Sequence, residues 1–453
     1  MTASNPDSPA PRQMRGYIEG YYGRLLDWQD RRRIVDRLAG LGMTAYLYAP
    51  KEDSFHRVAW RTAWPEDWLH GFAAFCDHAR DRQVDVIAGI APGLDYAPLD
   101  DDRDFARLAE KTASLVRAGA AGVALMFDDI EPVSEDSDTV TAEMAFHGGI
   151  ATRLAACSEV PILFLPRIYA DEISILAASA YATLDGALPA DMPVFHCGSH
   201  IVTGADPLSD ANTAAATGFR QRLIFWDNFF CNDYCPRRLF LGPHTGRSQV
   251  AEMMLNGTGM IETDLLLLDV MAAGEDQQAW RTALAENGVP DEIHDLAAWF
   301  GAPVMANDTS WTHPEATSAT FDAIERLLWR WKTPLSREWY PFIFGLKHDL
   351  LMASGELPSL RIKKTQTPAL SELLSPLTGK EPHQCPLSRS LMATTTSFPG
   401  FMATVRRIRP EPSSTDMTLP SIFRNRWLAG LPAASSPSTS RHWKSITRRG
   451  LRR

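Results

Sequence analysis

The sequence lacks a long apolar run. None of its 453 residues belongs to a stretch approaching the roughly 20 apolar residues that cross a bilayer. The N-terminus, MTASNPDSPAPRQMRG, is polar and has no apolar core of signal-peptide type. We therefore expect a cytoplasmic protein with no membrane partner.

Cysteine is also scarce, and its spacing excludes the common zinc motifs. Of the six cysteines, Cys231 and Cys235 are four apart, but no second Cys or His pair lies at zinc-finger distance. The turn after the first predicted strand, EGYYGRLLDW, lacks the GxGxxG spacing of a dinucleotide site. We predict reduced core thiols, no metal and no cofactor.

Basic residues are outnumbered over most of the chain. Lys and Arg total 45 against 55 Asp and Glu, and the net charge of −10 argues against a nucleic-acid partner held through its phosphates. Residues 1–360 carry −22, whereas residues 361–453 carry +12. This basic tail is rich in Ser, Thr and Pro, and we expect it, like residues 1–13, to be disordered. A tail that contacts nucleic acid or an acidic surface, and a tail produced by a shifted reading frame, are the alternatives.

Short apolar runs alternate with longer amphipathic segments from Met14 onward. Eight of these runs are typical of strands and begin near residues 15, 44, 84, 122, 161, 192, 222 and 257. Eight strand and helix units over residues 14–275 predict an α/β fold, a (β/α)8 TIM barrel. A doubly wound open sheet is the alternative, but it usually carries the glycine-rich turn that is missing here.

A helical pattern follows the predicted barrel. Apolar stripes recur at helical spacing in residues 279–287, 293–300 and 321–331. We therefore predict a small helical domain over residues 276–360, packed on the barrel and followed by the basic tail.

The strongest chemical signal is the segment MFDDIEP. Asp128 and Asp129 come directly after the apolar run GVALMF, at the strand end where barrel enzymes place their catalytic groups. Two close carboxylates repel each other when both are ionised, so we expect one raised pKa and an acid beside a base. Glycoside hydrolysis needs that division of labour. The alternative is a helix N-cap followed by a second acid that the helix dipole favours.

A second polar cluster ends the seventh predicted strand. Trp226 is either a core side chain or an apolar wall beneath a sugar. Asn228 and Asp233 follow it, either as ligands of sugar hydroxyls or as residues that cap turns.

Lys51 follows the second predicted strand, YLYAP. Pro50 restricts the backbone there, so Lys51 either reaches the functional rim or is a solvated surface group. We interpret the nearby His56 and Arg57 as structural partners of acidic residues.

Six sequence blocks, in this order, resemble glycoside hydrolase family 84. That family contains the protein O-GlcNAcases and bacterial β-N-acetylglucosaminidases, and the similarity covers roughly residues 14–270. The blocks are GYIEGYYG (16–23), YLYAPKED (46–53), HRVAWR (56–61), APGLD (91–95), LMFDDIEP (125–132) and FWDNFFCNDYCPRRLFLGPHTGRS (225–248).

The resemblance implies a retaining, exo-acting enzyme that hydrolyses terminal β-linked GlcNAc by substrate-assisted catalysis. In such a reaction the sugar's own 2-acetamido oxygen attacks the anomeric carbon and forms an oxazoline intermediate. The resemblance further implies that Asp128 orients the acetamido group, and that Asp129 protonates the leaving oxygen and then activates water.

The same resemblance implies the substrate contacts. Gly16 and Lys51 would bind sugar hydroxyls, and Tyr169 would bind the acetamido oxygen. Trp226 would line the acetyl pocket. The remaining sugar-binding residues would be Asn228, Asp233 and Asn256.

The chain departs from the family pattern at two places. Leu25 and Leu26 replace a familiar Pro-Trp after the first strand, and Arg167 and Ile168 precede Tyr169 where animal members carry smaller or acidic residues. These changes leave the aglycone open, whether glycoprotein, cell-wall fragment or small glycoside. The alternative function is a barrel that binds GlcNAc or a glycoprotein without turnover.

Overall fold

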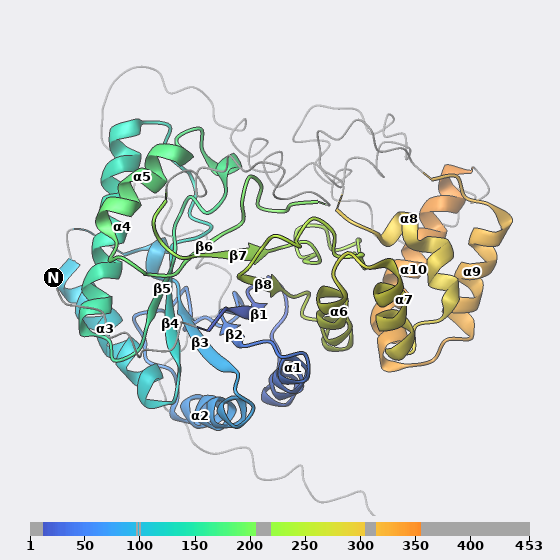
Figure 1. Cartoon of the computed structure of the whole chain (residues 1–453), viewed down its shortest axis with the longest axis horizontal. Helices are drawn as coiled ribbons and strands as arrows, with labels where there is room; N and C mark the ends of the chain where they lie inside the picture. The colour runs from blue at the N-terminus through green and yellow to red at the C-terminus, as the bar shows by residue number, and fades with distance from the viewer. Residues whose placement is uncertain (1–11, 97, 99–100, 205–218, 304–313, 355–453) are drawn as a thin grey trace, which may run out of the picture. The chain divides into compact units, whose positions relative to one another are not determined.

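The computed structural model describes residues 12–96, 98, 101–204, 219–303 and 314–354 (Figure 1). Within them, eight parallel strands close into a barrel in sequence order, because β1 pairs with both β2 and β8. The predicted (β/α)8 barrel is therefore confirmed. The strands are β1 (Arg15–Glu19), β2 (Ala45–Tyr48), β3 (Asp85–Ile90), β4 (Gly122–Met126), β5 (Ile162–Leu165), β6 (Val194–His196), β7 (Leu223–Asp227) and β8 (Met253–Asn256).

Helices cover the outside of the barrel (Figure 1). In the first of them Ile34, Val35 and Leu38 form the buried face, and Asp27 caps its start by accepting a hydrogen bond from the N–H of Asp30 at 2.8 Å. The helices are α1 (Trp28–Gly40), α2 (Glu66–Asp81), α3 (Asp101–Arg117), α4 (Ser137–Cys157), α5 (Ala177–Ala187) and α6 (Ile261–Ala273), with short 3₁₀ turns η1 (Pro92–Leu94) and η3 (Asp171–Ile173).

The alternation of strand side chains separates two apolar cores. Ile18, Leu47 and Met126 point into the barrel, where they pack together. Tyr17 and Tyr46 point outward and pack in the larger core between strands and helices. Since both faces of each strand are occupied by packing, the polar residues available for chemistry are those at strand ends.

The eighth strand differs from its prediction. It covers Met253–Asn256 instead of beginning near residue 257, so Asn256 ends the strand and does not precede it. Glycines then turn the chain. A Cβ atom at Gly257 would lie 2.2 Å from the Tyr17 hydroxyl, and Gly259 has a φ of +74°. The apolar residues of this segment resemble a strand in sequence, but they lie in a turn that leads into α6.

The helices after the barrel are α7 (Gln277–Glu286), η4 (Asp291–Leu296), α8 (Ala297–Phe300), α9 (Ser318–Trp329) and α10 (Pro334–Ala353). Of these helices, α7 and α10 pack against α6, whereas η4 and α9 pack against each other. Glu338 on α10 accepts hydrogen bonds from the backbone N–H groups of Glu262 and Thr263, at 3.1 and 2.8 Å, in the first turn of α6. α10 falls within the predicted helical domain of residues 276–360, although no separate helix was named over residues 334–353, and Pro341 lies inside it.

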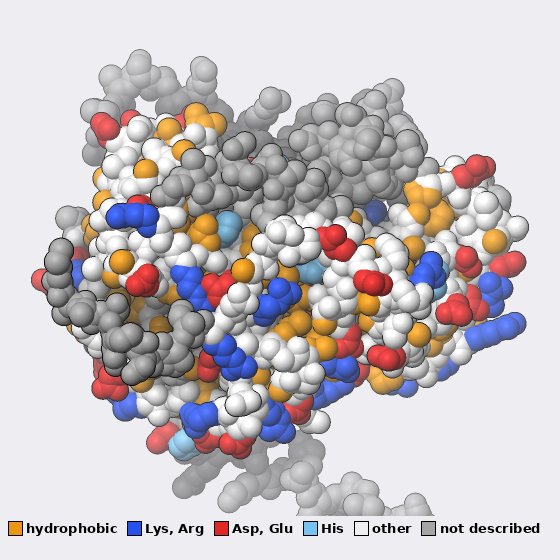
Figure 2. Space-filling view, in the orientation of Figure 1, with side chains coloured by type: hydrophobic (Ala, Val, Ile, Leu, Met, Phe, Trp, Pro, Cys, Tyr) orange, Lys and Arg blue, Asp and Glu red, His pale blue; other side chains and the backbone are white. Residues whose placement is uncertain are grey.

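The predictions of disorder at the two ends of the chain concern residues that the structure does not describe. The basic tail from residue 361 lies beyond the described residues, and so does most of the N-terminal segment 1–13. Among the helices that are described, none is long and apolar enough to span a membrane. Acidic and basic side chains are interspersed on the face shown in Figure 2, so the acidic excess does not form a single patch there.

Candidate active site

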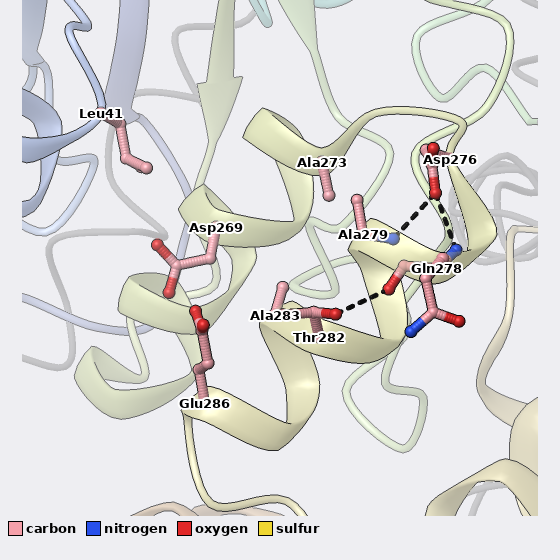
Figure 3. A pocket seen from close by; sticks show the side chains of 9 residues that line it. All are labelled: Leu41, Asp269, Ala273, Asp276, Gln278, Ala279, Thr282, Ala283 and Glu286. Carbon is pink, nitrogen blue, oxygen red and sulfur yellow. Dashed lines mark hydrogen bonds between the residues drawn. The ribbon is translucent and has the colours of Figure 1, made fainter.

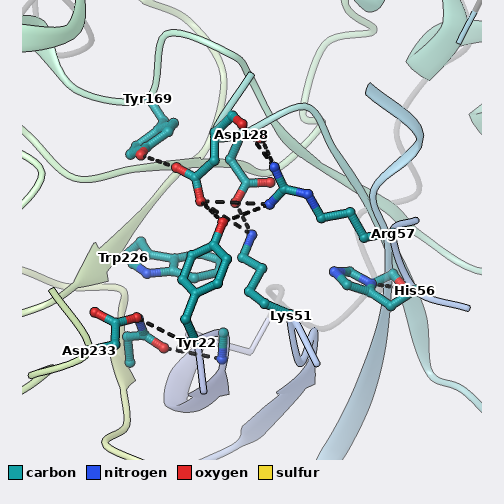
Figure 4. Close-up of polar contacts among 12 residues, drawn as sticks. Tyr22, Lys51, His56, Arg57, Asp128, Tyr169, Trp226 and Asp233 are labelled. Atoms are coloured by element: carbon teal, nitrogen blue, oxygen red, sulfur yellow. Dashed lines mark hydrogen bonds and ion pairs between the residues drawn. The ribbon is translucent and has the colours of Figure 1, made fainter. Parts of the chain in front are cut away.

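The predicted Asp pair lies directly after β4, at the C-terminal rim of the barrel (Figure 4). Asp128 is buried, and its Oδ2 forms an ion pair with the Lys51 ammonium, while its Oδ1 is buried without a hydrogen-bond partner. Asp129 has a left-handed backbone, with a φ of 54°, and its side chain is 32% exposed. The helix-cap alternative is wrong, because Asp136 caps α4.

Four side chains from three loops surround the Asp129 carboxylate (Figure 4). The Tyr169 hydroxyl donates to Oδ1 at 2.6 Å, and the Tyr22 hydroxyl donates to Oδ2 at 2.7 Å. Two cations lie slightly farther from Oδ2, with Arg57 at 3.7 Å and Lys51 at 3.8 Å. The carboxylate therefore has both hydrogen-bond donors and positive charge around it.

This environment corrects the predicted direction of the pKa shift. Burial is the largest single influence and raises the pKa of Asp129, but the Lys51 charge, the hydroxyls of Tyr169 and Tyr22, and the Arg57 guanidinium together outweigh it. The pKa of Asp129 is therefore lowered. The expectation of an acid beside a base considered only the two carboxylates, whereas the folded chain places two cations beside them.

Tyr22 was missed as a functional group in the sequence. Arg57 was interpreted only as a structural partner of an acidic residue, and it does lie 3.7 Å from the Asp129 carboxylate. Tyr22 reaches Asp129 from the loop after β1, and its hydroxyl accepts a hydrogen bond from Arg57 at 2.9 Å. Arg57 also donates to the backbone carbonyl of Asp129 at 2.8 Å. His56 does not pair with an acid as interpreted, because its Nδ1 contacts the Gly89 carbonyl at 2.8 Å. The only available signal was the position of these residues after strand ends.

The side chains at the ends of β7 and β8 form a neutral network. The Asn228 Oδ1 accepts hydrogen bonds from the Trp226 indole at 3.0 Å and from the Asn256 amide at 2.9 Å. The Asn256 Oδ1 accepts in turn from the backbone N–H of Gly20 at 3.1 Å. Trp226 also packs inside the barrel, edge-on to Phe195, so its core position and its contact with the site coexist.

Asp233 joins this network to the loop after β1. Its Oδ2 accepts a hydrogen bond from the backbone N–H of Tyr22 at 2.9 Å, and its Oδ1 accepts from the Cys231 thiol at 3.3 Å. The Tyr22 hydroxyl contacts Asp129, so this one residue connects the acidic pair with the β7 loop.

The prediction for Gly16 is wrong. Gly16 is the second residue of β1 and pairs with Ala45, the first residue of β2, whereas the other predicted residues gather at the opposite ends of the strands. A Cβ at Gly16 would lie 1.7 Å from the Ala45 carbonyl oxygen, so this glycine allows two strands to approach closely. The glycine at the site is Gly20, where a Cβ would lie 2.5 Å from the Trp226 ring.

Residues 15–262 match the model of a family described as beta-N-acetylglucosaminidase. The chain belongs to the beta-N-acetylglucosaminidase family. This confirms the resemblance to glycoside hydrolase family 84 that the six sequence blocks indicated.

Two curated relatives support this placement, and one solved structure shares the fold. The protein O-GlcNAcases of Rattus norvegicus and Mus musculus are each 28% identical to the chain over 246 residues, which cover 53% of the chain and 27% of each relative. The chain thus spans about a quarter of the length of these relatives. A mutant of the Thermobaculum terrenum O-GlcNAc hydrolase has the same fold, with a TM-score of 0.56 and 19% identity over 84% of this chain and 82% of that one.

A buried ionic cluster supports the β7 end of this candidate site. The Asp227 carboxylate accepts from His244 at 2.6 Å and from Arg247 at 3.1 Å, and all three side chains are almost fully buried. Burial alone would raise the pKa of Asp227, but Arg247 and His244 outweigh it and lower the pKa. Arg247 also donates to the Thr203 carbonyl at 3.0 Å, so the cluster ties two rim loops to β7.

A groove of about 380 Å³ between α6 and α7 is separate from this site (Figure 3). None of the site residues lines it. Several of its polar side chains already have partners within the protein. Asp276 caps α7 through the N–H groups of Gln278 and Ala279, Thr282 donates to the Gln278 carbonyl, and Asp269 pairs with Arg37 of α1. We assign no ligand to this groove.

Proposed function

We propose that the chain is a retaining exo-β-N-acetylglucosaminidase that releases terminal β-linked GlcNAc from a glycoside or glycoprotein by substrate-assisted catalysis. The observation that carries this proposal is the state of Asp128. One of its oxygens is held by Lys51, and the other is buried and free to accept a hydrogen bond. A buried carboxylate with a free oxygen suits the N–H of an acetamido group, because that hydrogen bond strengthens as positive charge develops on the amide.

In the first step, the acetamido carbonyl oxygen forms a bond to the anomeric carbon as the bond to the leaving oxygen breaks. Asp128 accepts the acetamido N–H and stabilises the positive charge of the oxazoline intermediate. Asp129 gives its proton to the leaving oxygen. In the second step, Asp129 takes a proton from water, and the water oxygen attacks the anomeric carbon from the face that the aglycone left. The bond between the anomeric carbon and the acetamido oxygen breaks at the same time, which restores the acetamido group. Two inversions give net retention of configuration.

Asp129 must carry a proton at the start of this sequence, although its pKa is lowered in the geometry described above. Two of the groups that lower it are tyrosine hydroxyls, and Tyr22 is 45% exposed. A sugar whose acetamido oxygen takes the Tyr169 hydroxyl would remove one donor from the Asp129 carboxylate. Loss of that hydrogen bond would raise the pKa of Asp129, so substrate binding itself would favour the acid form.

The test is release of 4-nitrophenol from 4-nitrophenyl β-GlcNAc, run beside the β-GalNAc glycoside and O-GlcNAc glycopeptides. Asp128→Asn and Asp129→Asn should each lose most activity, and a thiazoline that mimics the intermediate should inhibit. The leaving group separates the two roles, because Asp129→Ala should lose much less activity on substrates with very good leaving groups. Full activity in both Asn variants would overturn the proposal.

One observation favours a second function, a barrel that binds GlcNAc or a glycoprotein without turnover. The lowered pKa of Asp129 disfavours the protonated form that a general acid needs. Calorimetric binding of GlcNAc with no hydrolysis of any substrate in the screen would establish this second function in place of the first.

A further inference from the structure

We infer that Arg167 is a positioning residue that holds Asp129 in the orientation required for proton transfer. The inference rests on the proposed function, since it concerns the same acid. Arg167 is one of the residues at which the chain departs from its family, and it reaches Asp129 only through the backbone of the following turn.

The turn that carries Asp129 has little support of its own. In the described structure, residues 128–135 form no hydrogen bond between backbone groups, although regular backbone pairing precedes them in β4 and follows them in α4. Asp129 has a φ of 54°, a left-handed conformation that is unfavourable for any residue except glycine and, to a lesser degree, Asn or Asp. Such a conformation persists only where the surroundings hold it.

Arg167 supplies part of that support from the loop after β5. Its side chain is only 9% exposed, and its Nε donates to the Ile130 carbonyl at 3.1 Å. A second nitrogen donates to the Pro132 carbonyl, and the third forms an ion pair with Glu143 on α4. The planar guanidinium thus joins two carbonyls of the turn to the helix that follows it, through three nitrogens held apart in a rigid fork that a lysine ammonium lacks.

The same loop also holds the side chain of the acid. Tyr169, two residues after Arg167, donates to the Asp129 carboxylate at 2.6 Å. One short segment therefore fixes both the backbone after Asp129 and one carboxylate oxygen. A shift of the turn relative to this loop would change the angle at which the carboxyl group faces a leaving oxygen.

Arg57 holds the turn from the other side, through the Asp129 carbonyl at 2.8 Å. It is a less selective probe, because it also lies 3.7 Å from the Asp129 carboxylate and bonds Tyr22. Arg167 makes no contact with either carboxylate of the pair among the described contacts. A change at Arg167 therefore tests position with little direct change in the charge beside the acid.

The experiment compares Arg167→Ala with the wild-type chain on two aryl β-GlcNAc glycosides. Phenyl β-GlcNAc has a poor leaving group and needs the acid, whereas 3,4-dinitrophenyl β-GlcNAc needs little protonation. We expect kcat/KM to fall about 10- to 100-fold on the phenyl glycoside, since a misplacement of ~1 Å costs ~10²-fold, and less than about threefold on the dinitrophenyl glycoside. Glu143→Ala, which frees one end of the guanidinium, should show the same pattern with a smaller loss.

Two controls separate positioning from stability. Arg167→Lys keeps the charge but not the forked contacts, so it should resemble Arg167→Ala and should not restore the phenyl activity. Arg153→Ala removes an arginine of α4 that pairs with Asp101, away from the turn, and should leave both activities unchanged. Thermal unfolding confirms that each variant is folded at the assay temperature.

The outcomes distinguish this inference from the proposed function. Equal losses on both glycosides would mean that Arg167 only stabilises the fold, and full activity of Arg167→Ala on the phenyl glycoside would mean that the turn needs no clamp. Either result overturns the inference and leaves the hydrolase intact. A wild-type chain that hydrolyses neither glycoside overturns the proposed function, and the inference falls with it.

Discussion

The β4 side of the candidate site pairs carboxylates with cations, whereas the strand ends of β7 and β8 carry neutral groups, with one carboxylate, Asp233, in the loop after β7. Around β4, Asp128 and Asp129 face Lys51 and Arg57, so two anions meet two cations. Around β7 and β8 an indole and two amides share a chain of hydrogen bonds that ends on a backbone N–H. Tyr22 contacts both sides, through its hydroxyl and its backbone N–H.

The two sides also differ in how they are held. The charged side depends on contacts between loops, and the Asp129 carboxylate remains partly exposed. The neutral side rests on strand ends and on the buried Asp227 cluster beneath them. Charged groups suit proton transfer, and neutral hydrogen-bonding groups at strand ends suit the recognition of a sugar. Chemistry and recognition should therefore respond differently to substitution.

The largest expected effect is on the charged side. Asp129→Asn and Asp128→Asn should each lower kcat on 4-nitrophenyl β-GlcNAc by ~10²–10⁴-fold, because general acid–base help is lost in the first and charge stabilisation in the second. Steady-state kinetics measures this loss. Asp322→Asn, on α9 outside the site, is the matched control and should keep wild-type kcat. A loss confined to KM would contradict the division between chemistry and recognition.

The next largest effect concerns stability beneath the neutral side. Arg247→Ala leaves the Asp227 charge buried with one cation fewer, and we expect the free energy of unfolding to fall by about 3–5 kcal/mol. Urea unfolding measures this change. The exposed pair Arg107–Glu110 offers the control, since Arg107→Ala should change stability by less than about 0.5 kcal/mol. Similar values for both variants would show that the Asp227 cluster does not support β7.

A smaller effect should appear in recognition. Asn228→Ala removes the oxygen that accepts from both Trp226 and Asn256, so the buried indole N–H loses its partner and the Asn256 amide keeps only its contact with the Cys231 sulfur. We expect KM to rise about tenfold with kcat changed less than about threefold. This pattern arises when a substitution weakens the binding of the ground state and of the transition state equally. Asn287 caps the C-terminal end of α7, away from the site, and Asn287→Ala should leave KM unchanged. A fall in kcat with constant KM would assign Asn228 to the chemistry.

The smallest effect is a shift in pH dependence that tests the contact between the two sides. Tyr22→Phe removes a hydrogen bond that lowers the pKa of Asp129, so that pKa should rise. A general acid acts in its protonated form, and a higher pKa extends that form to higher pH. The alkaline limb of kcat/KM should therefore move up by about 0.5–1 pH unit. Tyr234→Phe, another exposed tyrosine of the rim, should leave the limb in place, and a downward shift in Tyr22→Phe would contradict the role of this hydroxyl.

Some of the site could be predicted from the chain because strand ends are local features. The apolar run before Asp128 predicts a buried strand, and parallel strands in a barrel bring their carboxyl ends to one rim. Lys51 and Trp226 follow the same logic, and both reach the site. The prediction for Gly16 did not follow this logic, because Gly16 lies at the start of β1. Gly20, directly after that strand, contacts Trp226 instead.

The sequence by itself determined the barrel, its rim and the acidic pair, because apolar periodicity and strand ends are read from neighbouring residues. Only the tertiary structure decided the ionisation of Asp129 and the support of its turn. Those properties depend on Tyr22, Arg57 and Arg167, which come from three different loops. Electrostatic and hydrogen-bond energies depend on distances through space, and no local pattern in the chain contains them.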